Sequence, residues 1–97
     1  MAVWTVNIVP GDPPKLVAPD QPKSEPGTVY ADSGDVVFWN NTTNDTYQIS
    51  LLILLPSQGI VTPGHQSDAF NVGASIDYTC RAQPNRDPPV VGKIIVT

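Results

Sequence analysis

The single cysteine of the sequence, Cys80, is the residue best suited to carry chemistry. It closes the apolar run "IDYTC" and is followed by the polar loop "RAQPNRDPP" and by a second apolar run that begins at Val90. A thiolate in such a place can hold a soft metal ion. A free cysteine at the end of a strand is more often a small, inert core side chain, because burial disfavours the thiolate. Arg81 would favour the thiolate only if both residues faced the same side, and neighbouring strand residues face opposite sides.

Other residues that could do chemistry are few. The chain has one histidine, His65, which follows a Pro-Gly turn. An atypical metal site could combine His65 and Cys80 with Tyr47 or Gln83. The sequence shows no Ser–His–Asp grouping and no pair of carboxylates spaced for acid–base catalysis. We therefore predict that the protein is not an enzyme, and metal binding stays open as the alternative.

Composition and charge limit the kinds of partner. The chain of 97 residues has nine acidic and five basic residues, a formal net charge of −4, and no cluster of Lys or Arg. Nucleic acid and anionic membranes call for a concentrated positive field, so neither is expected as a partner. No apolar run approaches the roughly 18–20 residues of a membrane span, and the first residues lack the pattern of a signal peptide. We expect one domain, spanning residues 1–97, without membrane insertion.

The distribution of proline and glycine predicts an all-β chain. Eleven prolines and seven glycines leave no window long enough for a regular helix, and short β-branched and aromatic runs recur between turn residues. The expected strands are Ala2–Val9, Lys15–Ala18, Thr28–Ala31, Asp35–Asn40, Tyr47–Leu55, Ser67–Val72, Ser75–Arg81 and Val90–Thr97. Seven to eight short strands in a chain of this length predict a β-sandwich. The proline-rich segment from Pro10 to Pro26 is interpreted as a stiff surface connection.

Four sequence words in order resemble the cupredoxins, the blue copper proteins such as plastocyanin and azurin. They are "SGDVVFWNN", "TPG" at Thr62–Gly64, "YTC" at Tyr78–Cys80, and "VGKIIVT" at Val91–Thr97. The resemblance covers the chain from about Lys15 to the C-terminus. It implies the cupredoxin-like Greek-key β-sandwich, and a periplasmic, secreted or cell-surface location. It also implies that an Asn such as Asn40 or Asn41 holds the first ligand loop by hydrogen bonds, here in a structural role.

The resemblance also implies where copper ligands would stand. Cupredoxins hold copper with two imidazoles, one thiolate and a weak axial ligand. Aligned on that pattern, this chain has Tyr47 and Gln83 where histidines are expected and Val90 where methionine is expected, and only Cys80 matches. A phenol is a hard, protonated oxygen at neutral pH and an amide is a poor equatorial donor. We therefore expect a degenerate copper site, and no metal or other cofactor.

Two runs are more apolar than strands with one solvent-exposed face. "DVVFW" places Val36 and Phe38 on one face and Val37 and Trp39 on the other, and "ISLLILL" has no polar residue after Ser50. A sandwich covers one face of each sheet. The other face would be covered by the proline-rich loops, or by a second copy or another protein. On the second interpretation Trp39, Leu52 and Leu54 form a partner surface.

Together these patterns predict a non-catalytic cupredoxin-like domain that has lost its type 1 copper site and acts as a protein-interaction or assembly module. The alternatives are a copper-binding electron carrier with an atypical site around Cys80, and an accessory domain of a larger enzyme. The partner would be another protein or a second copy of the chain, bound through apolar strand faces.

Overall fold

The computed structural model describes residues 2–11, 14–19, 27–51, 59–83 and 89–97. These residues form β-strands joined by turns and loops. The strands are β1 (Val3–Val9), β2 (Lys15–Val17), β3 (Thr28–Ala31), β4 (Val36–Asn41), β5 (Thr46–Ser50), β6 (Ile60–Val61), β7 (Phe70–Asn71), β8 (Ile76–Gln83) and β9 (Val90–Val96).

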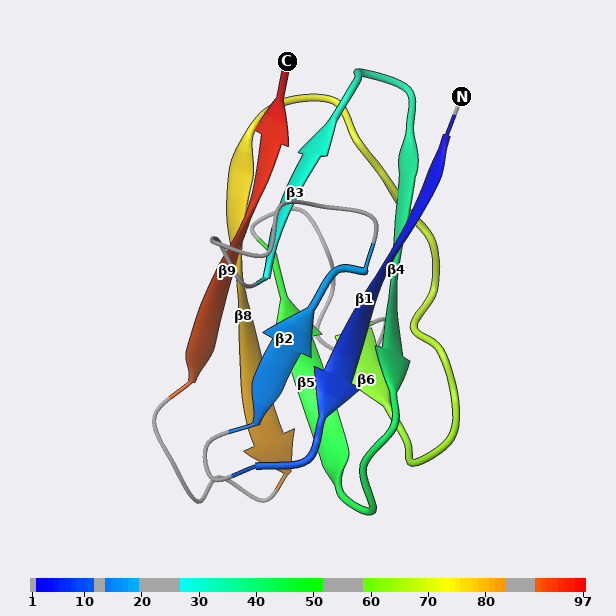
Figure 1. The fold of residues 1–97 in the computed structure, drawn as a ribbon, viewed down its shortest axis with the longest axis vertical. Coiled ribbons are helices and arrows are strands. Elements are labelled where there is room, and N and C mark those ends of the chain that lie inside the picture. Colours follow the sequence, from blue (N-terminus) through cyan, green and yellow to red (C-terminus); the bar gives the residue numbers. More distant parts are fainter. Residues whose placement is uncertain (1, 12–13, 20–26, 52–58, 84–88) are drawn as a thin grey trace.

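The strands form two sheets that pack face to face (Figure 1). One sheet has the order β2-β1-β4-β7 and the other has the order β3-β9-β8-β5-β6. Strands β1 and β4 run parallel, as do β3 and β9, while the remaining pairs are antiparallel. The predicted all-β sandwich is confirmed, and the described residues contain nine strands where seven to eight were predicted. The added strand is β6, a two-residue element inside a segment that sequence reasoning treated as a connection.

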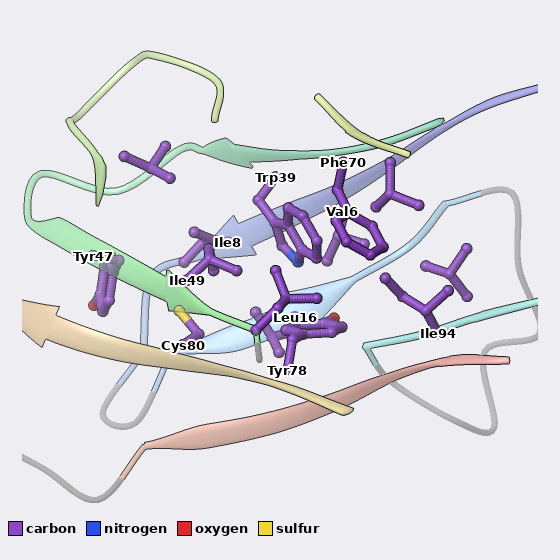
Figure 2. Packing of buried hydrophobic residues seen from close by; sticks show 14 of the residues in the cluster. Val6, Ile8, Leu16, Trp39, Tyr47, Ile49, Phe70, Tyr78, Cys80 and Ile94 are labelled. Carbon is purple, nitrogen blue, oxygen red and sulfur yellow. The ribbon is translucent and has the colours of Figure 1, made fainter. Parts of the chain in front are cut away.

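The core lies between the sheets because each strand alternates inward and outward side chains. From the four-stranded sheet, Val6 and Ile8 of β1 and Trp39 of β4 point inward and are fully buried. Tyr78 and Cys80 of β8 meet them from the other sheet (Figure 2). The remaining buried hydrophobic members of this cluster are Leu16, Val29, Ala31, Val37, Tyr47, Ile49, Leu51, Val61, Phe70, Val72, Ala82 and Ile94.

An aromatic cluster occupies the centre of this core. The rings of Trp39 and Tyr78 meet edge to face, with centroids 4.9 Å apart and an interplanar angle of 69°, and Phe70 packs against Trp39 from the side. The Nε1 atom of Trp39 is buried and has no hydrogen-bond acceptor among the described residues.

Candidate functional site

The sheet brings three of the four predicted ligand positions together. On β8, Cys80 lies opposite Ile49 of β5 on one side and opposite Val90 of β9 on the other. Tyr47 is two residues from Ile49 on β5, so it lies on the same inner face. Gln83, at the end of β8, pairs through its backbone with Thr46. The ligand positions that the resemblance implied therefore fall in one region, at the end of the sandwich where β8 ends and β9 begins.

The Cys80 side chain is part of the core. Its exposed fraction is 1%, and the sulfur lies beside Ile8 and Ile49 (Figure 2). Burial raises the pKa of the Cys80 thiol to about 12, because no solvent is present to stabilise the thiolate. Arg81 is exposed and so lies on the opposite face of β8, as the strand alternation predicted. The thiol is therefore protonated at neutral pH.

The residues at the other predicted ligand positions, Tyr47 and Val90, contribute to the packing of the core. Tyr47 is 2% exposed and Val90 is partly buried against the core cluster. A phenol, a valine side chain and a protonated thiol provide one soft donor atom and no imidazole. Among the residues that the structure describes, no group of three or more His, Cys, Asp or Glu side chains could hold a metal ion.

His65 lies in the connection between β6 and β7 and not on the strands that carry Tyr47, Cys80 and Val90. It sits in the turn between β6 and β7, where its N–H donates to the Thr62 carbonyl oxygen at 3.1 Å and its own carbonyl accepts from the Asn41 N–H at 3.0 Å. The His65 side chain is exposed, whereas Cys80 is 1% exposed.

Asn41 organises the loop that would carry the first ligand. Its side chain is fully buried, and its Nδ2 group donates to the carbonyl oxygens of Asp45 at 2.6 Å and of Val61 at 2.9 Å. Its Oδ1 atom accepts from the N–H and the hydroxyl of Thr43. These bonds tie the β4–β5 loop to β6. The side chain of Asn41 therefore has the structural role that was expected for an Asn at this point of the chain.

The predicted partner surface was wrong for Trp39. This residue is 0% exposed, because Val37 and Trp39 of β4 face the core while Val36 and Phe38 face outward. Leu52 and Leu54, the other two members of that surface, lie outside the described residues. A strand that is apolar on both faces has no alternation of polar and apolar residues to show which face is buried. The prediction therefore placed the Trp39 face at the surface, whereas this face is the buried one.

Sequence reasoning also missed Asp35, which holds the N-terminal strand in place. Its carboxylate is 5% exposed and accepts hydrogen bonds from the N–H of Ala2 at 2.8 Å and from the indole Nε1 of Trp4 at 3.0 Å. The N–H of Asp32 donates to it at 2.9 Å. These three bonds, in that order of effect, hold the pKa of the Asp35 carboxyl at about 2, below its ordinary 3.8. Two of the partners are more than 30 residues away in sequence, so no local motif points to this role.

Comparison with solved structures identifies the architecture. A copper(I) form of an amicyanin mutant superposes with a TM-score of 0.57 and 15% identity, covering 98% of this chain and 82% of that one. A copper nitrite reductase from Nitrosomonas europaea superposes with a TM-score of 0.60 and 16% identity, covering 99% of this chain. A blue copper oxidase from the same organism gives 0.53 and 16% over 98% of this chain. The chain has the cupredoxin-like fold.

The chain spans less than half the length of these two larger proteins. The chain corresponds to 41% of the nitrite reductase chain and to 38% of the blue copper oxidase chain. No family model and no curated protein matches the sequence. In the described part of the chain, no helix has the length and apolar character to cross a membrane.

Proposed function

We propose that this chain is a non-catalytic cupredoxin-like domain that has lost its type 1 copper site and acts as a protein-interaction or assembly module. The observation that carries the proposal is the chemistry of the ligand region. Cys80 is a buried, protonated thiol flanked by Tyr47 and Val90, where a trigonal copper site requires two imidazoles. The residues at this end of the sandwich do not fit a type 1 copper ion, so no electron-transfer step is derived from it.

The interaction role is supported by apolar side chains on the outer surface. Val3 and Val91 are each 57% exposed and Val17 is 41% exposed, although these residues lie within regular strands. Val3 and Val17 lie on neighbouring strands of the four-stranded sheet, and Val91 lies on the other sheet. Exposed apolar residues that group together commonly mark contact surfaces. The likeness to about two fifths of two larger copper proteins supports a second candidate, an accessory domain of a longer enzyme. The proposed location is periplasmic, secreted or cell-surface.

Titration with Cu(II) tests the loss of the copper site. The folded protein at stoichiometric Cu(II) is expected to show no intense visible absorption from thiolate-to-copper charge transfer, because the only sulfur is protonated and no pair of imidazoles completes the site. An amicyanin serves as the positive control. A strong visible band that the Cys80→Ser variant lacks would overturn the proposal in favour of the copper carrier.

The interaction role is tested by photo-crosslinking in the producing cell. A photoreactive residue replaces Val3 in one variant and Val91 in another, because the two valines are equally exposed on opposite sheets. A module that works by contact should give protein adducts from at least one position. The absence of any adduct from both positions, with both variants folded, would contradict the interaction role.

A further inference from the structure

Three Asn-x-Thr patterns lie where β4 ends and β5 begins, in the stretch "NNTTNDT". They start at Asn40, Asn41 and Asn44. This pattern is the acceptor of N-linked glycosylation in eukaryotic secretory proteins. Asn and Thr are also common in turns, so the pattern by itself does not single out an acceptor. The surroundings of the three side chains in the fold do.

The fold leaves no space for a glycan on Asn41. This side chain is 0% exposed, and its Nδ2 group donates to the carbonyl oxygens of Asp45 at 2.6 Å and of Val61 at 2.9 Å. An amide has two N–H hydrogens, and a glycan on Nδ2 would replace one of them, so one of these carbonyl oxygens would lose its donor. The sugar would also have to enter a closely packed interior. A chain glycosylated at Asn41 therefore cannot reach this fold.

Asn40 lies within the sheet and is partly buried. It pairs with Asn7 of β1 on one side and forms a bridge with Gln66 on the other. Its Nδ2 group donates to Asn7 Oδ1 at 3.3 Å. A bulky glycan on this nitrogen would lie against the side chains of both neighbours and compete with the amide pair. Asn40 is therefore a poor acceptor.

Asn44 has neither restriction. It is exposed in the loop between β4 and β5, and no hydrogen bond joins its side chain to another described residue. The hydroxyl of Thr43 holds this loop, since it accepts from the Asp45 N–H at 3.1 Å and donates to Asn41 Oδ1 at 2.7 Å. The conformation of the loop therefore does not depend on the Asn44 amide, and a glycan on this amide displaces no contact among the described residues.

We infer that Asn44 is the residue of this chain that accepts an N-linked glycan when the chain passes through a eukaryotic secretory pathway. The donor is a lipid-linked oligosaccharide pyrophosphate. A bond forms between Asn44 Nδ2 and C1 of the first sugar, the bond from C1 to the pyrophosphate oxygen breaks, and the amide proton leaves with the lipid pyrophosphate.

The glycan would stand at one end of the sandwich. Thr46, which completes the pattern, pairs with Gln83 at the end of β8, so Asn44 lies at the end that holds the degenerate ligand positions (Figure 1). It is attached to a loop and not to the outer face of either sheet. Glycosylation at Asn44 is therefore compatible with the proposed interaction role through a sheet face.

Secretion of the full chain from a eukaryotic cell, behind a cleavable leader, tests the inference. The secreted protein should run as a larger band that shifts down when an amidase removes N-linked glycans, and peptide mass mapping should locate the modified residue at Asn44. Thr46→Val should abolish the glycan, whereas Thr46→Ser should retain it because the pattern accepts either hydroxyl. Asn40→Gln is the matched control and should leave the band unchanged.

Circular dichroism shows whether each secreted variant is folded. A folded, secreted chain without a glycan at Asn44, or a folded chain with a glycan at Asn41, would overturn the inference. So would a glycan that Thr46→Val leaves in place and Asn40→Gln removes. None of these results bears on the interaction role, because the crosslinkers at Val3 and Val91 report on contacts whether or not Asn44 carries a glycan.

Discussion

Tyr78 is the side chain on which the centre of the fold depends. Its hydroxyl donates to the Gly27 carbonyl oxygen at 2.5 Å, which joins the start of β3 to the middle of β8. Burial raises the pKa of this phenol above its ordinary range, so it stays protonated and able to donate. The ring lies over Gly92, its partner on β9, where a Cβ atom would come within 2.2 Å of Tyr78 Cζ. The glycine therefore makes room for the ring.

Replacing Gly92 by alanine should destabilise the protein by about 2 kcal/mol, because the added methyl group must push the Tyr78 ring out of a packed core. The measurement is urea unfolding followed by tryptophan fluorescence. Gly73→Ala is the control, since a Cβ at Gly73 meets no atom within 4 Å. The control should stay within about 0.5 kcal/mol of the unmodified chain. Equal effects of the two substitutions would show that the Tyr78 ring does not depend on Gly92.

The N-terminal strand is held by tertiary contacts, since β1 and β4 run parallel and no hairpin turn can connect them. Their register places Val3 opposite Val36, and the Val36 N–H donates to the Ala2 carbonyl oxygen at 2.9 Å. The Asp35 carboxylate closes this end of the pair with its bonds to Ala2 and Trp4. One ionised group thus fixes the start of β1 against the start of β4.

Asp35→Asn should lower the thermal midpoint by several degrees at neutral pH. The amide of the variant has one oxygen in place of two, so its N–H₂ group would face N–H donors that now bind the carboxylate. The negative charge that strengthens these hydrogen bonds would also be lost. Because the folded pKa of about 2 lies below the ordinary 3.8, ionisation stabilises the fold fully above about pH 4. That contribution is lost as pH falls from about 4 to about 2. Thermal unfolding across this range should therefore show a smaller acid-induced decline for the variant.

The control for this series is Asp68→Asn, at an exposed position. Its thermal midpoint at neutral pH should match that of the unmodified chain to within about a degree, as expected for a surface substitution. If Asp35→Asn retained the full acid-induced decline, the Asp35 carboxylate would not be the group that anchors β1.

The bounds of a strand could be predicted from the sequence where turn residues lie directly beside it. Turn residues predicted both bounds of β3 and the start of β9. The resemblance to cupredoxins placed Tyr47 and Val90 near Cys80, and the strand pairing of the structure brings these residues to one region. The direction in which Trp39 faces was not predictable, since its strand is apolar on both sides. Nor was β6, whose two residues form a strand only because β5 lies beside them.

At the level of the entire protein, charge is the property that acts farthest beyond the molecular surface. Acidic residues such as Asp32, Asp45 and Asp68 lie in turns and loops outside the strands. The principal extents of the molecule are 34, 29 and 22 Å. The Debye length is about 30 Å at 0.01 M salt and about 8 Å at 0.15 M. At low salt, therefore, charges across one molecule are felt by a second copy, and at physiological salt they are largely screened.

The net charge predicts how salt changes any self-association of the chain. Two copies with a charge of −4 each repel at low salt. Raising NaCl from about 0.01 M to about 0.15 M should therefore strengthen the association of two copies several-fold in sedimentation equilibrium. Association that weakens as salt rises would mean that the copies meet through oppositely charged residues.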